Sequence, residues 1–130
     1  MYALGERFDL IISFSGLEHD GLGRYGDPLH PEGDLTAMRE IHLLTAPDGM
    51  LLLGVPTGSP DDVEFPMQRI YGPRRLKRMI DGWSLAGRVL SNKAVLGGLD
   101  MAAVPPKLFP NATEQRNRWM HQPVLALYRL

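Results

Sequence analysis

The sequence contains no cysteine, has almost no net charge and has no long hydrophobic run. Because cysteine is absent, the chain can form neither a disulfide framework nor a thiolate metal site. Its 14 basic and 15 acidic residues nearly cancel, so bulk charge does not favour nucleic acid or an anionic membrane as a partner. No segment approaches the ~20 apolar residues of a membrane span, and the first residues have no secretory-signal pattern. We therefore expect a cytoplasmic protein with no nucleic-acid or membrane partner.

Length and composition predict a single unit. The chain has 130 residues, of which 44% are hydrophobic, and this is enough for one modest core. No internal repeat, low-complexity tract or linker divides the sequence. We expect residues 1–130 to form one domain.

The most informative stretch is an apolar strand that ends abruptly in polar residues. Apolar side chains occupy every second position from Phe8 to Phe14, which predicts a strand of about eight residues ending at Ser15. From Gly16 to Pro31, glycines and prolines are too dense for a strand or a long helix. Ligands of open α/β sheets bind beyond the carboxyl ends of strands, so we expect the active face in this exposed loop. Its ionisable residues are Glu18, His19, Asp20, Arg24, Tyr25, Asp27 and His30.

The same loop contains a G-x-G-x-x-G pattern at Gly21, Gly23 and Gly26. A dinucleotide fingerprint requires these glycines to turn directly from a strand into a helix. Here they lie well beyond the strand, and Pro28 would fall inside such a helix. We expect the glycines instead to allow positive φ angles and close backbone approach.

The next segments predict a βαβ unit. A helix is expected from Asp34 to Ala46, a turn at Pro47-Asp48-Gly49, and a strand from Met50 to Pro56 that is covered on both faces. The two strands should be parallel, which places the loop of residues 57–65 beside the loop of residues 18–31. The carboxylates of residues 61, 62 and 64 could bind a divalent cation, but we expect them to face water.

The C-terminal part predicts one helix and two strands. The helix should begin near Pro73 and end at Gly82, with a basic face in solvent. Strands are expected at residues 84–90 and 122–129, paired antiparallel. Residues 91–122 are expected to form a long irregular segment between the two strands, with one helical turn around Glu114 to Trp119.

These patterns resemble two families. The second half of a class I S-adenosylmethionine-dependent methyltransferase has a strand ending in Leu-Glu-His, a helix, a turn and a further strand, as in FDLIISFSGLEH and LTAPDGMLLLGVP here. More narrowly, EHDGLGRYGDPLHPEGDLTAM and RIYGPRRL are similar to the uncharacterised methyltransferase-like family named domain of unknown function 268. The narrow resemblance covers Phe8 to Trp83. It departs from that family at Pro66 and Gln68, where Asn and His are common.

The methyltransferase resemblance implies an α/β fold that is the C-terminal half of a Rossmann-like sheet, with a parallel βαβ unit and a terminal antiparallel strand pair. The acidic-x-Gly-x-Gly-x-Gly loop that holds the cofactor in such enzymes is not present in the sequence. The chain alone is therefore not expected to bind S-adenosylmethionine. Without the preceding strand, the strand from Phe8 to Ser15 would be an edge, and both sheet faces would be partly uncovered. We expect self-association through this edge.

The resemblance also implies roles for individual residues. Methyl transfer requires positioning and, for an oxygen or nitrogen acceptor, a base. His19 is the preferred base because histidine changes charge near neutral pH, although it could equally do no more than hydrogen-bond its own loop. Arg24 could alternatively form an ion pair with Asp27. The full assignment is Glu18, His19 and Asp20 as catalytic residues, Ser15 and Gly16 beside the methionine end of the cofactor, and Arg24, Tyr25, Arg69 and Tyr71 around the acceptor.

Two other functions remain open. One is a metal-dependent hydrolase with Glu18, His19, Asp20, Asp27 and His30 as ligands, which are suitable residue types without a recognised spacing. The other is a non-catalytic pseudo-enzyme or interaction subunit, which the absence of the cofactor loop favours. The sequence does not identify the acceptor of a methyl group.

Overall fold

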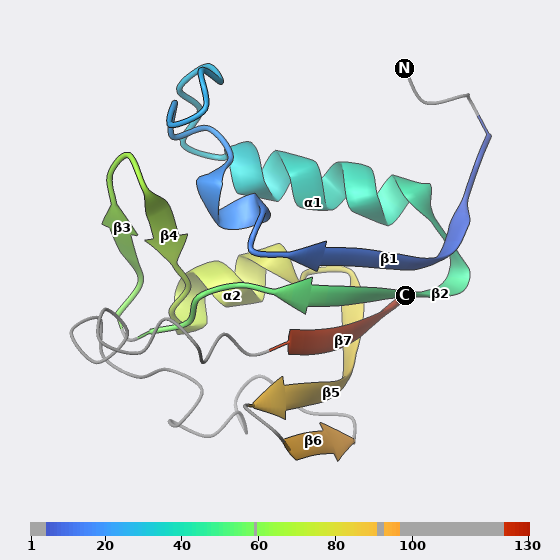
Figure 1. The fold of residues 1–130 in the computed structure, drawn as a ribbon. Coiled ribbons are helices and arrows are strands. Elements are labelled where there is room, and N and C mark those ends of the chain that lie inside the picture. The colour runs from blue at the N-terminus through green and yellow to red at the C-terminus, as the bar shows by residue number, and fades with distance from the viewer. Residues whose placement is uncertain (1–4, 59, 91–92, 97–123) are drawn as a thin grey trace.

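The computed structural model describes residues 5–58, 60–90, 93–96 and 124–130 (Figure 1). Seven strands, two α-helices and one short 3-10 helix are found in these residues. In chain order they are β1 (Phe8–Phe14), η1 (Leu17–His19), α1 (Gly33–Leu44), β2 (Thr45–Gly54), β3 (Asp62–Glu64), β4 (Gln68–Ile70), α2 (Pro73–Met79), β5 (Trp83–Leu90), β6 (Lys93–Leu96) and β7 (Val124–Arg129).

Five strands form one mixed sheet in the order β1-β2-β7-β5-β6. β1 and β2 are parallel and are connected through α1, which confirms the predicted βαβ unit. β7 lies between β2 and β5 and is antiparallel to both, so the predicted antiparallel pairing of the last strand with β5 is also confirmed. The fold class is α/β with a mixed sheet.

Two strand predictions differ from the structure. The strand predicted to start at Met50 already starts at Thr45, because Phe8 pairs with Thr45 while Leu10 pairs with Met50. The predicted turn around Asp48, whose φ is 60°, is thus an irregularity within the β1–β2 pairing. β6 and the β3–β4 hairpin were not predicted, because their strands are too short to show a periodic pattern. The helical turn predicted at residues 114–119 lies outside the described residues.

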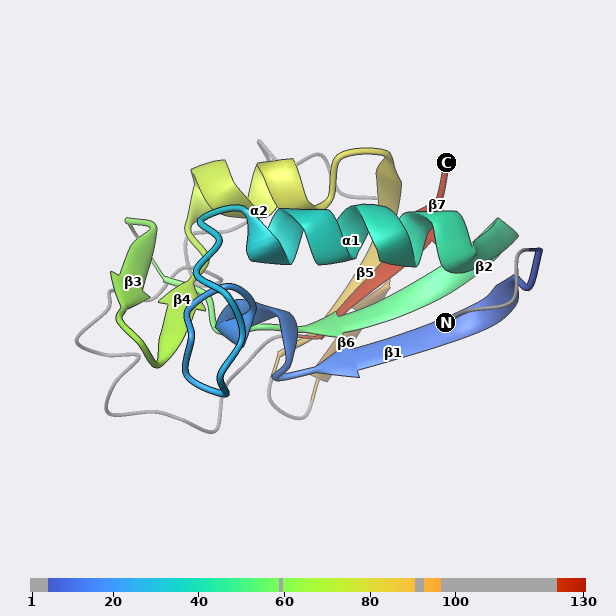
Figure 2. The ribbon, with the colours of Figure 1, turned by 90° about the horizontal axis from the view of Figure 1, so that it is seen from above.

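Both helices pack on the same face of the sheet (Figure 2). The core lies between them and the sheet, and Leu51, Leu53 and Leu127 are completely buried there. Each such side chain contributes about 1.5–3 kcal/mol to folding. On the opposite face Leu52 is only half-buried, so the prediction that β2 is covered on both faces is wrong for the described residues.

β1 is an edge strand in the described part of the sheet, as predicted. Its side chains on the face away from the helices are exposed, with Ile12 66% and Phe14 63% accessible, while Ile11 packs against the core. α1 and α2 cover most of the other face, but at β1 Ile11 is only partly buried and Asp9 is exposed there, so both faces of the described sheet are partly uncovered, as expected. Within the described residues, β1 thus has both exposed apolar side chains and an edge that pairs with no further strand.

The two described α-helices are short. Neither is long and apolar enough to span a bilayer.

Candidate functional site

The site begins where β1 ends. Ser15 adopts a left-handed conformation with φ 51°, which for a non-glycine residue costs on the order of 1–3 kcal/mol. Its backbone N–H donates to the carbonyl of Gly54 at 2.9 Å, extending the contact between β1 and β2. Its hydroxyl donates to Oε1 of Glu18 at 2.7 Å. These bonds turn the chain sharply from the strand into η1.

Glu18 is buried rather than exposed in the loop, which corrects the sequence-based expectation. Its side chain has no solvent exposure, and Oε1 accepts the Ser15 hydrogen bond. Oε2 has no hydrogen-bond partner within the described residues. A buried carboxylate oxygen without a partner is costly, so such an atom is a candidate for a functional role.

His19 follows Glu18 and is held by a hydrogen bond at one ring nitrogen. Nδ1 lies 2.5 Å from the carbonyl oxygen of Met67, in the turn between β3 and β4. Because a carbonyl can only accept, Nδ1 carries the proton in this hydrogen bond. Nε2 lies 3.6 Å from Oε1 of Glu18. The neutral imidazole therefore has its lone pair at Nε2, beside a carboxylate that would stabilise the charged ring.

Asp20, the third predicted catalytic residue, is partly buried at the end of η1. Desolvation raises the pKa of Asp20 above its ordinary value, and the nearby carboxylates of Asp27, Asp34 and Glu18 raise it further, against the opposing effect of Arg69. The carboxyl group of Asp20 thus lies in a region of excess negative charge.

The segment from Gly16 to Pro31, called the glycine-rich loop below, is organised around Asp27. Its carboxylate accepts the backbone N–H groups of Gly21 at 2.7 Å, Gly23 at 3.4 Å and Tyr25 at 3.3 Å. Desolvation alone would raise the pKa of Asp27. The hydrogen bonds outweigh this effect and lower the pKa from its ordinary value.

The three glycines have the conformations that were predicted from the sequence. Gly21, Gly23 and Gly26 have φ angles of 77°, 76° and 82°. A Cβ atom on Gly21 would lie 2.1 Å from the carbonyl oxygen of His30. This confirms positive φ and close backbone approach as the role of the glycines, and no helix begins at the motif.

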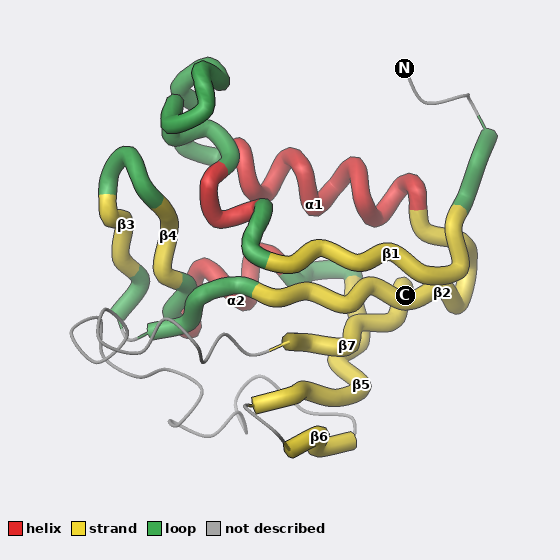
Figure 3. The backbone as a smooth tube through the Cα atoms, viewed as in Figure 1, coloured by secondary structure: helices red, strands yellow, loops and turns green. Residues whose placement is uncertain are grey.

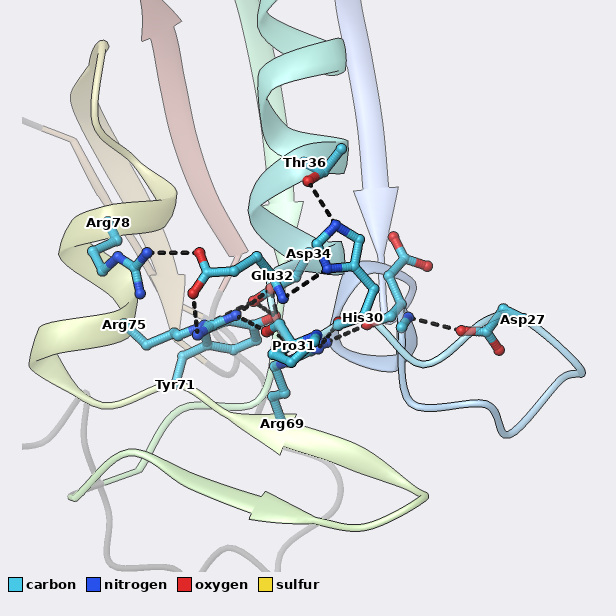
Figure 4. A network of polar contacts seen from close by, with 12 residues as sticks. Asp27, His30, Pro31, Glu32, Asp34, Thr36, Arg69, Tyr71, Arg75 and Arg78 are labelled. Atoms are coloured by element: carbon cyan, nitrogen blue, oxygen red, sulfur yellow. Dashed lines mark hydrogen bonds and ion pairs between the residues drawn. The ribbon is translucent and has the colours of Figure 1, made fainter.

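Asp34 links α1 to β4 and α2 through a buried network (Figure 4). Its carboxylate accepts hydrogen bonds from the Tyr71 hydroxyl at 2.9 Å and from Arg75 at 2.5 and 3.1 Å, and it lies 3.7 Å from Nε of Arg69. Burial and the adjacent Asp34 raise the pKa of Tyr71 well above its ordinary value. The hydrogen bond with Asp34 raises the pKa of Arg75. The sequence pattern predicts Asp34 only as the start of a helix, because nothing local indicates its distant partners.

Arg69, in β4, binds the glycine-rich loop through hydrogen bonds. It is 3% exposed and donates to the backbone carbonyls of Asp20 at 2.5 Å, His30 at 3.3 Å and Pro31 at 3.4 Å. Tyr71 is completely buried. An acceptor-binding role for Arg69 and Tyr71 stays a prediction that these contacts do not favour, because their polar atoms are directed at the protein.

Arg24 and Tyr25 lie in the exposed part of the loop. The Arg24 guanidinium lies over the Tyr25 ring at 5.2 Å, and the ring meets His19 edge-on at 5.7 Å between centroids. Asp27 uses its carboxylate for the backbone N–H groups described above rather than for an ion pair with Arg24. Both residues thus remain accessible to a ligand near His19.

The glycine-rich loop and the β3–β4 hairpin lie side by side at the carboxyl ends of β1 and β2 (Figure 3), as predicted. Between them is a cleft of about 660 Å³. Its walls are formed mainly by apolar side chains from both segments, namely Leu22, Leu29, Val63, Phe65 and Ile70. Clefts of this size and character hold small ligands in many proteins.

The candidate metal ligands do not converge. Within the described residues, no group of three or more His, Asp or Glu side chains could hold a metal ion. Asp27 is occupied by backbone N–H groups, and Nδ1 of His30 accepts the Glu32 N–H at 3.2 Å. The metal-dependent hydrolase hypothesis therefore has no ligand set in this part of the chain.

A family model matches most of the chain. The family described as "Caenorhabditis protein of unknown function, DUF268" matches residues 1–99. No curated protein and no solved structure matched the chain.

Proposed function

We propose that this chain, which belongs to the DUF268 family, provides the base and acceptor side of an S-adenosylmethionine-dependent methyltransferase site. The family description assigns no activity, so the proposal rests on the site and on the resemblance of the βαβ unit. The observation that carries it is the Glu18–His19 pair at the carboxyl end of β1. Ligands of open α/β sheets bind at that edge.

The residues at the strand end suit the methionine end of the cofactor. Ser15 and Gly16 are exposed there, and a Cβ atom on Gly16 would meet nothing closer than the Ser13 hydroxyl at 3.6 Å. The open space beside Gly16 would admit an extended ligand. The residues that hold the adenosine end would have to come from outside the 130 residues, because the sequence has no acidic-x-Gly-x-Gly-x-Gly loop.

When bound, the cofactor would supply the methyl group, and the chain would manage the proton that an oxygen or nitrogen acceptor releases. His19 would take that proton at Nε2, because Nδ1 is already protonated and donates to the Met67 carbonyl. Glu18, 3.6 Å from Nε2, would stabilise the resulting imidazolium. The ring does not need to reorient before it accepts the proton, since the hydrogen bond from Nδ1 to the hairpin carbonyl already places Nε2 near Glu18.

The proposal is tested by replacing His19 and a matched histidine in the complete gene product. His42 is the control, because its ring also hydrogen-bonds a backbone carbonyl, that of Gly82 at 3.2 Å, but lines the separate groove between α1 and α2. Transfer of a labelled methyl group from S-adenosylmethionine is measured over a panel of amines and alcohols. We expect His19→Ala to lower the rate about 10²-fold or more, which is typical for loss of a general base. His42→Ala should leave it unchanged.

A melting curve separates catalysis from folding. His19→Ala should melt close to the parent, because the His19 side chain is 15% exposed and most of its loop is held by Asp27 and Arg69. If His19→Ala turns over at the parental rate, the base assignment is wrong. A large loss of stability with intact turnover would identify His19 as a structural residue.

The second candidate function is a non-catalytic interaction subunit. This function is favoured by the edge of β1, which has no partner strand in the described part of the chain, and by the exposed Leu10, Ile12 and Phe14, since such edges pair readily with other chains. The same assay distinguishes it. An interaction subunit would transfer no methyl group to any acceptor in the panel, whereas an Ile12→Lys substitution would weaken its association with the partner.

A further inference from the structure

The cleft between the glycine-rich loop and the β3–β4 hairpin has a feature that the proposed function does not use. Its apolar walls are unusually accessible, with Leu29 69%, Val63 50% and Phe65 65% exposed. Large apolar side chains that line a cleft and remain in contact with water favour an apolar ligand there.

The positive charges that line the cleft are already compensated. Arg69 donates to backbone carbonyls and lies beside Asp34, and Arg75 donates to both oxygens of Asp34 and to the Pro31 carbonyl at 2.8 Å. Arg75 also forms an ion pair with Glu32, with Nη1 and Oε1 3.8 Å apart. Little positive charge is left to attract an anionic ligand.

Two carboxylates in the same cleft have no such compensation. Oδ1 of Asp61 accepts the backbone N–H of Arg75 at 3.0 Å, at the start of α2. Oδ1 of Asp62 accepts the backbone N–H of Val63 at 2.8 Å. Among the described residues, no cation lies within ion-pair distance of either carboxylate. The cleft therefore combines an apolar surface with net negative charge.

We propose that this cleft binds an amine with an apolar body. The aromatic or branched aliphatic body would lie against Leu29 and Phe65, and the positively charged ammonium group would lie beside Asp61 and Asp62. Charge complementarity selects the amine, because an anion would meet two carboxylates and a neutral alcohol would leave them without a counter-ion. The inference is independent of the proposed function, because neither Glu18 nor His19 lines the cleft.

The test compares three probes of similar size and different charge. 2-Phenylethylamine, 2-phenylethanol and phenylacetate are titrated into the complete gene product without S-adenosylmethionine. Binding is followed through the methyl NMR signals of Leu22, Val63 and Ile70, which line the cleft. We expect the amine to bind about fivefold more tightly than the alcohol, the scale of one partly exposed charge pair, and the acid to bind most weakly.

A substitution of Asp62 isolates the charge effect. Asp62→Asn keeps a side-chain oxygen that can accept the Val63 N–H, so the hairpin should be retained. We expect Asp62→Asn to reduce the preference for amine over alcohol without changing alcohol affinity. The control Asp81→Asn, in the separate groove between α1 and α2, should behave as the parent.

The outcomes are distinct for the two proposals. Equal binding of the three probes, tightest binding of the acid, or no shift at the three cleft methyl groups would overturn the amine inference. If the amine binds as expected but is never methylated, the cleft assignment stands, and the methyl-transfer proposal is decided separately by the acceptor panel and His19→Ala. If an alcohol is methylated while the amine preference is absent, only the present inference fails.

Discussion

Replacing Asp34 with alanine should destabilise the protein strongly, because this carboxylate joins three elements. The substitution removes hydrogen bonds from Tyr71 and Arg75 and the nearest negative charge to Arg69. Arg69 is 3% exposed and would keep its positive charge without a counter-ion. We expect the contact of α1 with β4 and α2 to loosen first.

The magnitude follows from the burial of the partners. Removing one member of a buried ion pair typically costs about 3–5 kcal/mol, since the remaining charge is left uncompensated. Asp34 is completely buried, so solvent screening reduces this value little. For a domain of this size, each kcal/mol lowers the melting temperature by roughly 3–5 °C. Asp34→Ala should therefore melt roughly 10–25 °C below the parent.

Two further variants make the measurement specific. Tyr71→Phe removes a single hydroxyl from the network and should cost only about 0.5–1.5 kcal/mol. Asp81→Ala removes an exposed aspartate and should change stability by no more than about 0.5 kcal/mol. Thermal unfolding by circular dichroism measures all three. If Asp34→Ala melts within two or three degrees of Asp81→Ala, on the scale of about 1 kcal/mol, the network does not hold the helices together.

Three other substitutions test separate parts of the account. Gly21→Ala should destabilise the loop by about 2 kcal/mol or more in chemical denaturation, because its Cβ would overlap the His30 carbonyl and φ is positive; a neutral effect would contradict this backbone path. Asp20→Asn should raise the melting temperature at pH 7. Because the pKa of Asp20 is raised in the folded state, the stabilisation from its protonated carboxyl group is complete below about pH 4 and is lost as pH rises through the folded-state pKa. The increase in melting temperature caused by Asp20→Asn should therefore vanish in acid. An equal increase at both pH values would refute this reasoning. Ile12→Lys should reduce self-association in sedimentation velocity, because it places a charge on the exposed face of the edge strand; unchanged association would exclude β1 as the contact.

Long periodic segments were predictable from the sequence, whereas contacts between distant segments were not. The pattern of apolar residues located β1, α1, β2, α2, β5 and β7, and the dense glycines and prolines located the loop. The alternation in β1 suggests that Leu10, Ile12 and Phe14 face a core, yet these side chains are exposed, and it is Ile11 that packs under the helices. Alternation identifies the two faces of a strand but not which face the rest of the described chain covers.

The candidate site was predictable in position but not in detail. Its place at the end of β1 followed from strand polarity, and the structure brings Ser15, Glu18 and His19 together there. The burial of Glu18 could not be foreseen, because η1 and the β3–β4 hairpin that surround it have no periodic signal. The role of Asp34 likewise depends on residues far along the chain.

The central claim is that S-adenosylmethionine binds at the carboxyl end of β1, and photo-crosslinking of methyl-labelled cofactor to the complete gene product tests it most directly. Trypsin cleaves after Arg7 and Arg24, so one peptide, Phe8 to Arg24, contains Ser15, Gly16 and the catalytic candidates. We predict that label appears in this peptide and is competed away by unlabelled cofactor. Competable label found elsewhere in residues 1–130 but absent from this peptide, or no competable label at saturating cofactor, would contradict the claim.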